Sequence, residues 1–363
     1  MRVLVVNAGS SSLKLSVLDD DRRILDETLP SPRGRVDEQA LRAAVDEAGT
    51  IEAVGHRIVH GGPTFLEPVR VDAAVVRRLH ELADLAPLHQ LKSLHALEVM
   101  TRLLPGVPAV ACFDTSFHAR MPEAASTYAL PAEWRKRWPL RRFGFHGLSH
   151  AYASQRAAEL AGRGADGVRV ITCHLGAGAS LAAVSDGRSV DTTMGFTPLE
   201  GLVMGTRSGT LDPGLVLWLE EHVGMPPSEL AVTLEHRSGL LGLSGSADMK
   251  AVLEAEAAGD EDASLAVEVY LHRLRAEIGA MAAALGGLDA LVFTGGVGER
   301  SPAIRRRTAD GLGFLGVVVD EASNEAPELD AEVTAPDAAV RTFVVEARED
   351  LQIARGVRSV LAA

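Results

Sequence analysis

The chain has 363 residues, of which 47% are hydrophobic and 23% charged, a composition typical of folded proteins and unlike that of disordered or collagen-like chains. Its 36 lysines and arginines against 49 aspartates and glutamates give a net charge of −13, which repels nucleic acids and anionic membranes. Because one hydrophobic core rarely grows to this length, we predict two lobes, and we expect no nucleic-acid or membrane partner.

No apolar run is long enough to cross a membrane. The best candidate, Ile278 to Phe293, is interrupted by three glycines and by Asp289. The N-terminal MRVLVVN is too short for the apolar core of a signal peptide, so we expect a cytoplasmic protein. Cys112 and Cys173 each lie in an apolar run without metal-ligand spacing, and we expect two buried, reduced thiols.

Two strand-turn-strand patterns open the two halves of the chain. The first has an apolar strand at Val3 to Val6 and a polar turn at 7–12, followed by an alternating second strand. The second has strands at Val168 to Cys173 and Leu181 to Val184 around the small-residue turn 174–180. The recurring hairpin predicts that one α/β unit is duplicated.

Apolar residues at helical spacing lie between and after these hairpins. We predict helices at Asp37 to Ala48, Lys92 to Leu104, Ser149 to Arg163, Ser228 to Gly239 and Ala263 to Leu285, and another that begins at Ser301 and Pro302. Strands and helices therefore alternate, and no proline- or serine-rich linker separates the halves. The pattern predicts an α/β fold whose lobes share a cleft.

Two motifs near the N-terminus carry groups that suit anions. NAGSSSLK at 7–14 gathers a carboxamide, hydroxyls and flexible backbone amides, which form either an anion cradle or an ordinary polar turn. GHRIVHGG at 55–62 places Arg57 and His60 in an otherwise apolar strand. An arginine there holds either a carboxylate or phosphate ligand or a structural salt bridge.

Two further motifs place titratable side chains beside apolar segments. CFDTSFH at 112–118 puts Asp114 just after a strand, where α/β folds carry catalytic groups and also turn formers. RRFGFHGLSH at 141–150 holds His146 between Phe145 and a glycine. This histidine either faces a cleft or is satisfied within the core.

The second half contains a long segment rich in turn-forming residues. Residues 191–213 suit neither helix nor strand and contain Arg207 as their only basic residue, and loops of this length are usually functional. FTGGVGER at 293–300 would let a nucleotide approach the backbone closely. Glu349 and Asp350 begin a helix-like stretch, either as site carboxylates or as compensation for the helix dipole.

Taken in order, these motifs resemble those of the acetate kinase family, part of the wider group of acetate and sugar kinases, actin and heat-shock chaperone ATPases. The resemblance runs from Asn7 to Arg355. It implies two ribonuclease-H-like lobes with the active site in the cleft between them. It implies an N-terminal lobe of residues 1–149 and 351–363 on the acyl-substrate side, and a C-terminal lobe of residues 150–350 that binds nucleotide and dimerises.

The resemblance also implies the reaction, a reversible Mg²⁺-dependent transfer of the ATP γ-phosphoryl group to acetate in a homodimer, with Mn²⁺ able to replace Mg²⁺. The matching catalytic positions are Arg57, Asp114, His146 and Arg207, and those around the acetate are Arg57, Val59, Leu88, Phe145 and Pro198. The matching positions for ATP and ADP are Lys14, His174, Leu175, Gly176, Ala177, Gly178, Asp248, Met249, Lys250, Gly295, Gly296, Val297 and Gly298. Asn7 and Glu349 match the positions that organise the metal ion through water.

Several positions depart from the family pattern. Ala177 replaces an asparagine of HLGNGAS and Lys250 replaces an arginine near the adenosine, so we expect weaker ATP binding. Arg300 and Gln90 each replace an asparagine, and neither is expected to reach the phosphoryl site. Two alternatives therefore stay open. One is a propionate or butyrate kinase, although Val59 resembles the residue that closes the methyl pocket in acetate kinases. The other is a non-catalytic nucleotide-binding protein.

Overall fold

The computed structural model describes residues 1–9, 12–31, 37–85, 87–162, 164, 167–325, 327 and 329–362, without the side chains of residues 85 and 87–89. Ser10 and Ser11 of the first predicted turn, and Arg163 at the end of a predicted helix, lie outside the described residues.

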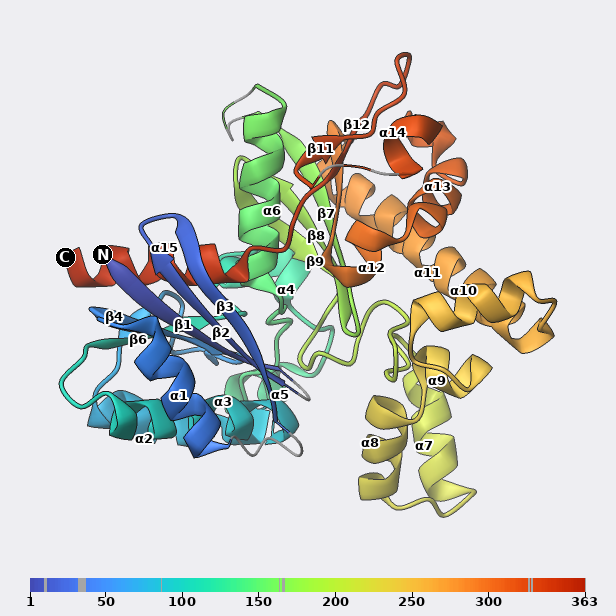
Figure 1. Ribbon diagram of the computed structural model, residues 1–363. Helices are drawn as coiled ribbons and strands as arrows, with labels where there is room; N and C mark the ends of the chain where they lie inside the picture. The colour runs from blue at the N-terminus through green and yellow to red at the C-terminus, as the bar shows by residue number, and fades with distance from the viewer. Residues whose placement is uncertain are drawn as a thin grey trace.

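The described chain forms two sheets that share one topology (Figure 1). The first has the order β3-β2-β1-β4-β6-β5 and is made of β1 (Arg2–Ala8), β2 (Ser12–Asp19), β3 (Arg22–Pro30), β4 (Ala53–Ile58), β5 (Val69–Arg70) and β6 (Ala109–Phe113). The second has the order β11-β12-β10-β7-β8-β9 and is made of β7 (Arg169–Leu175), β8 (Ala179–Ser185), β9 (Arg188–Thr192), β10 (Ala290–Thr294), β11 (Ala331–Glu332) and β12 (Arg341–Val344).

Helices cover both sheets and extend beyond them. In the first half they are α1 (Glu38–Ala48), α2 (Ala73–Glu81), α3 (Pro87–Leu103), α4 (Glu123–Ser126), α5 (Ala132–Arg137) and α6 (Gly147–Leu160). In the second half they are α7 (Pro213–Glu221), α8 (Pro227–His236), α9 (Gly239–Ser244), α10 (Met249–Ala257), α11 (Glu261–Leu285), α12 (Gly295–Arg300), α13 (Pro302–Asp310), α14 (Glu321–Glu325) and α15 (Glu349–Ala362). Figure 1 shows α7 and α8 projecting away from both sheets.

The predicted duplication is confirmed, and with it the predicted fold of two ribonuclease-H-like lobes. In each sheet an antiparallel hairpin leads into two parallel strands: β1 pairs with β2 and then β4, and β7 pairs with β8 and then β10. The hairpin registers end at equivalent places, with Asn7 opposite Lys14 and Leu175 opposite Ala179. Both hairpin tips therefore lie at the carboxyl ends of the first parallel strands, where α/β folds bind ligands.

The C-terminal helix α15 packs on the first sheet, across β4 (Figure 1). Gly55 makes this contact possible, because a Cβ there would lie 2.5 Å from a methyl group of Ile353 and 2.8 Å from one of Val357. The same packing places Glu349, the first residue of α15, beside the end of β1, where it bonds to Asn7.

The predicted helices are present, with ends set by local caps. The Asp37 side chain accepts hydrogen bonds from Gln39 and Ala40 and begins α1, and Ser301 caps α13 with Pro302 in its first turn. One detail differs from expectation: the predicted strand at 55–62 ends at Ile58, before His60. The glycines after β10 belong to the short helix α12.

None of the helices formed by the described residues is long and apolar enough to cross a membrane. Cys112 and Cys173 are both free and buried, as expected, and burial raises the pKa of each thiol above its ordinary value.

Candidate functional site

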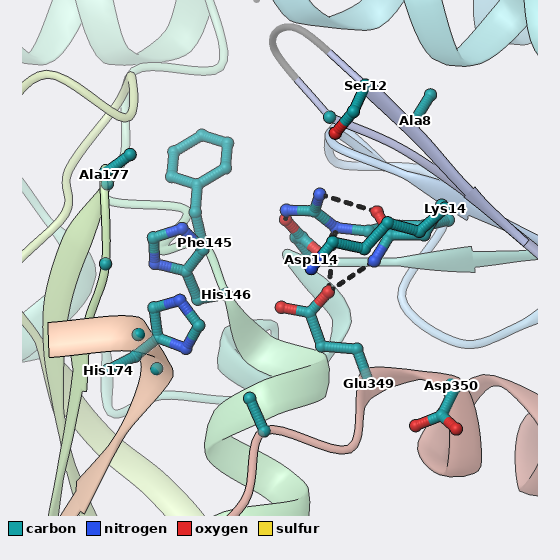
Figure 2. A pocket seen from close by; sticks show the side chains of 18 of the residues that line it. Ala8, Ser12, Lys14, Asp114, Phe145, His146, His174, Ala177, Glu349 and Asp350 are labelled. Carbon is teal, nitrogen blue, oxygen red and sulfur yellow. Dashed lines mark hydrogen bonds and ion pairs between the residues drawn. The ribbon is translucent and has the colours of Figure 1, made fainter. Parts of the chain in front are cut away.

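A central cavity of about 540 Å³ lies where the two sheets face each other, and residues of both sheets line it. Figure 2 shows His146, His174 and Ala177 on one side, opposite Lys14, Asp114 and Glu349. The predicted site residues in its lining are Asn7, Lys14, Arg57, Val59, Asp114, Phe145, His146, His174, Gly176, Ala177, Gly178, Pro198, Arg207, Gly295, Gly296 and Glu349. The fold thus brings together residues that the sequence scatters over most of the chain.

Arg57 and Asp114 form a buried bidentate ion pair at the ends of β4 and β6. The Nε and Nη2 atoms of Arg57 donate to the two carboxylate oxygens of Asp114 at 2.9 and 2.5 Å. Its Nη1 donates to the amide oxygen of Asn7 at 3.1 Å. Burial by itself lowers the pKa of Arg57, but the Asp114 and Glu349 carboxylates outweigh it and hold that pKa above the ordinary value. The guanidinium is therefore permanently charged and fixed in position.

Oxygen atoms that suit a hard cation gather beside this pair. The Asn7 amide donates to Glu349 at 2.7 Å, and Arg57 lies 3.9 Å from the same carboxylate. Burial by itself raises the pKa of Glu349, but Arg57 and His174 outweigh that effect and hold this pKa below its ordinary value, so Glu349 stays ionised. Among the described residues no three acidic, histidine or cysteine side chains lie close enough to enclose a metal. The donor set fits Mg²⁺ held largely through water.

His146 begins α6 in the left-handed conformation, with φ 54° and ψ 23°. Its ring stacks on that of His174, with centroids 4.3 Å apart. Burial lowers the pKa of His146 well below 6.5, and the neighbouring His174 and Arg57 lower it further. The imidazole is therefore neutral at neutral pH.

A chain of hydrogen bonds behind His146 selects its tautomer. The Thr172 hydroxyl lies 2.7 Å from His150 Nδ1 and 3.5 Å from the carbonyl of Ala182, so we assign it as donor to the histidine. His150 then donates from Nε2 to Ser180 at 2.7 Å, and Ser180 donates to His146 Nδ1 at 2.9 Å. This leaves the N–H of His146 on Nε2, the atom beside Gly178 at the cavity.

Arg207 enters the cavity from the long loop, whose lack of helix and strand between β9 and α7 agrees with the prediction for 191–213. Its Nη1 donates to the carbonyl of Pro198 at 2.6 Å. A Cβ at Gly178 would lie 2.6 Å from its Nη2, so only glycine lets the side chain pass. Within the described chain no acidic side chain forms an ion pair with Arg207, and this favours an anionic ligand.

The apolar part of the central cavity is small. Val59, Phe145 and Pro198 line it and are buried, and Figure 2 shows Phe145 next to His146. Leu88, the fourth predicted member, belongs to α3, but its side chain is not among those described. A wall of this kind suits a short aliphatic group.

An adjoining cavity of about 890 Å³ opens on the side of α10 and α12. Asp248, Met249, Lys250 and Val297 line it; all four are among the positions that the sequence predicts to bind nucleotide. Asp248 caps α10 by accepting from the backbone N–H of Lys250 at 3.1 Å. The Lys250 side chain is 83% exposed, and its Nζ lies 3.8 Å from the carboxylate of Glu254, another residue in the lining of this cavity.

Two predicted residues lie outside both cavities. Leu175 and Gly298 are buried, Leu175 in the core of the second sheet and Gly298 against Phe293. Gly295 has φ +78°, and a Cβ there would lie 2.8 Å from the carbonyl oxygen of Leu175. Leu175 and Gly298 therefore support the turn that lines the cavity without lining it themselves.

Two of the departures from the family pattern lie in different surroundings. Arg300 lines both cavities. It ends α12 and comes four residues after Gly296, on the same face of that helix. Gln90, in contrast, is buried and exchanges two hydrogen bonds with the backbone of His60.

Some residues in and around the central cavity were not predicted from the sequence. Ser180 and His150 lie inside quoted motifs, but only the fold shows that both bond toward His146. Arg23, whose Nε donates to Asp350 at 2.8 Å in the wall of the central cavity, has no motif that could have pointed to it.

Comparison with known proteins gives a consistent result. The profile of the Acetokinase family matches residues 35–355. The acetate kinase of Thermotoga maritima is 42% identical, over 99% of each chain. The crystal structure of Porphyromonas gingivalis acetate kinase is 36% identical with a TM-score of 0.89, and that of a propionate kinase from Francisella tularensis is 33% identical with a TM-score of 0.91, each over 99% of both chains.

Proposed function

This chain belongs to the acetokinase family and is a kinase that phosphorylates acetate, and we propose that the central cavity carries out the transfer of the ATP γ-phosphoryl group. One observation carries the proposal. Arg57, Arg207 and the neutral His146 converge on one cavity, which adjoins a second cavity large enough for a nucleoside. Such a set suits the transfer of an anionic group between two oxygen atoms.

In the central cavity the methyl group and the carboxylate of acetate are bound by different residues. Val59, Phe145 and Pro198 enclose the methyl group, and Arg57 holds the carboxylate. Asp114 fixes the guanidinium of Arg57 through two hydrogen bonds, so the carboxylate is oriented before the reaction begins. An ionised carboxylate is itself the nucleophile, and no general base is needed.

The nucleotide occupies the adjoining cavity, with its phosphates directed into the central one. Met249 and Val297 contact the base, and the phosphates pass Gly176, Ala177 and Gly296. A carboxylate oxygen of acetate attacks the γ-phosphorus in line, and the bond from that phosphorus to the bridging oxygen of ADP breaks. The products are acetyl phosphate and ADP, and the reverse reaction uses the same groups.

Charge on the transferred group is neutralised from two sides. Arg207 and the Nε2–H of His146 donate to its equatorial oxygens in the transition state. Asn7 and Glu349, with Asp114 nearby, would hold Mg²⁺ through water, and Mn²⁺ could replace it. When bound, this cation supplies further neutralisation of the phosphate oxygens.

Acetyl phosphate formation tests the proposal. Acyl phosphates are trapped with hydroxylamine after incubation with Mg²⁺ and ATP, comparing acetate, propionate and butyrate at matched concentrations. We expect acetate to be preferred, although one methylene changes selectivity by only about 1 to 3 kcal/mol. The similarity to a propionate kinase makes propionate the second candidate. If none of the three gives a hydroxamate, the chain is a nucleotide-binding protein without this activity.

Ser180 should act as a positioning residue for His146. Ser180→Ala removes the donor to Nδ1, so the N–H is no longer held on Nε2, and we expect kcat to fall about 10-fold with both KM values unchanged. Ser180→Thr keeps the hydroxyl and should restore most of kcat. Steady-state kinetics decide the matter. The control is Ser189→Ala, since Ser189 bonds to His118, which lies outside the cavity lining.

We assign residues 1–149 and 351–363 to an N-terminal lobe that holds the acyl substrate, and residues 150–350 to a C-terminal lobe that binds nucleotide and dimerises. The packing of α15 on the first sheet supports this division. Exposed apolar side chains on and beside α7 and α8 support a homodimer through the C-terminal lobe; they are Leu215, Leu217, Trp218, Val223 and Val232, each more than 40% exposed.

A charge on α7 should separate the subunits. Trp218, 51% exposed, is the largest side chain of this patch, and Trp218→Glu should convert the protein from dimer to monomer at micromolar concentration. Size-exclusion chromatography with light scattering measures the mass. Trp134→Glu is the control, because Trp134 is 48% exposed but lies on α5. A monomeric wild-type protein, or a Trp218→Glu dimer, would contradict this interface.

We further propose that the enzyme works in the cytoplasm without nucleic-acid or membrane partners. The net charge of −13 opposes binding to polyanions. The two free, buried cysteines suit a reducing compartment.

A further inference from the structure

The junction of the two cavities is made by few residues. Gly176, Ala177, Gly296 and Arg300 are the ones that line both. The first three have no side-chain hydrogen-bond donor. Arg300 is therefore, in the described part of the chain, the single charged side chain at the passage between the two cavities.

Arg300 is placed by α12. It lies four residues after Gly296, on the same face of the helix. A Cβ at Gly296 would meet no atom within 4 Å, so the backbone there borders open space. The arginine side chain thus flanks an open passage whose other borders are small residues.

No protein group competes for this guanidinium. Within the described residues Arg300 forms no ion pair or hydrogen bond, and it is exposed. The acidic residue next to it, Glu299, is turned inward, where its carboxylate accepts from the backbone of Gly295 and Ala347 at 3.0 and 2.9 Å. The nearby carboxylate of Glu254, in the lining of the adjoining cavity, has Lys250 as its ion-pair partner at 3.8 Å. An unpaired, planar guanidinium suits a phosphate, which it can bind through two parallel hydrogen bonds.

We propose that Arg300 binds the phosphate chain of the nucleotide at this junction and makes the site selective for nucleoside di- and triphosphates over monophosphates and nucleosides. This inference rests on the proposed function, in which the nucleotide spans the two cavities. It assigns Arg300 to nucleotide binding and gives it no part in holding acetate.

Binding of ADP, AMP and adenosine to the wild type and to Arg300→Ala, measured by calorimetry without turnover, tests this role. We expect the Kd of ADP to rise about 10- to 100-fold, that of AMP to rise less, and that of adenosine to stay unchanged. In the hydroxamate assay the KM of ATP should rise and that of acetate should not. Arg306→Ala is the control, since Arg306 lies on α13 and pairs with Glu321 at 3.4 Å.

The outcomes separate this inference from the proposed function. Unchanged ADP affinity in Arg300→Ala, or an equal loss for ADP and adenosine, overturns the role of Arg300 even if acetyl phosphate is formed normally. A wild type that makes no acyl phosphate overturns the proposed function, while a selective loss of ADP binding would still support the role of Arg300. A wild type that binds no ADP overturns both.

A second variant tests whether the effect arises at the junction. Ala177→Asn adds a carboxamide donor at another of the four shared residues. If both side chains reach the same phosphates, Ala177→Asn should recover more ADP affinity in the Arg300→Ala background than it adds to the wild type. Equal gains in the two backgrounds would contradict a shared contact. Because Arg300 is exposed, its replacement should leave the thermal unfolding midpoint unchanged.

Discussion

Replacing Arg207 with alanine should lower kcat about 1,000-fold while changing the Kd of ADP little. Its guanidinium donates to the carbonyl of Pro198, and among the described residues no carboxylate forms an ion pair with it, although Glu235 partly offsets the lowering of its pKa by burial. Its charge is therefore available to the group that moves between acetate and ADP. ADP itself lacks that group, so its affinity should not depend on Arg207. Steady-state kinetics and ADP calorimetry measure the two quantities.

The control for this variant is Arg237→Ala. Arg237 is an exposed arginine of the same part of the chain whose Nη2 donates to the hydroxyl of Thr233 at 2.7 Å. It should leave kcat unchanged. Arg207→Lys should recover only part of kcat, because lysine keeps the charge but loses the planar fork. Near-normal turnover of Arg207→Ala would refute its role in the transfer.

Replacing Asp114 with alanine should abolish measurable turnover and also destabilise the protein by about 3 to 5 kcal/mol. The variant leaves Arg57, only 14% exposed, without its bidentate partner. Glu349 is 3.9 Å away and cannot substitute in the same geometry. The guanidinium would then be both unneutralised and free to rotate, so acetate would lose its fixed anchor. Urea unfolding and the hydroxamate assay measure the two effects.

A double replacement separates stability from catalysis here. Arg57→Met with Asp114→Leu removes both charges, so no buried charge is left without a partner. Most of the lost stability should return, whereas turnover should not. If Asp114→Ala alone has the same urea midpoint of unfolding as the wild type, the ion pair between Arg57 and Asp114 does not stabilise the fold.

The main features of the fold were predictable because they depend on local patterns. Strand alternation around small-residue turns identified both hairpins, and the Asp37 cap marked the start of α1. Residues that follow strands, such as Asp114, were good candidates because strand ends meet at one edge of a sheet. The comparable position of the two hairpins in the chain also predicted the duplicated topology.

Other features of the site depend on contacts that no local pattern records. Arg23 bonds to Asp350, 327 residues away, and nothing in its neighbourhood marks it as part of a cavity wall. The place of Arg300 in the walls of both cavities was not predictable, because three glycines in one short segment favour a loop, whereas packing against β7 and β10 makes them helical. The Ser180 relay required the relative placement of α6 and β8, which sequence spacing does not provide.

The position of α15 has a consequence for the synthesis of this protein on the ribosome. Asn7 and Glu349, which bond to each other, are 342 residues apart, and the face of the first sheet around Gly55 is covered by the last helix of the described chain. The first sheet therefore emerges with an apolar face that has no cover until residues 349–362 have been made. During that interval the nascent chain is open to aggregation and is a natural client for chaperones. Premature termination before residue 349 would leave the first sheet uncovered and would also remove a carboxylate from the central cavity.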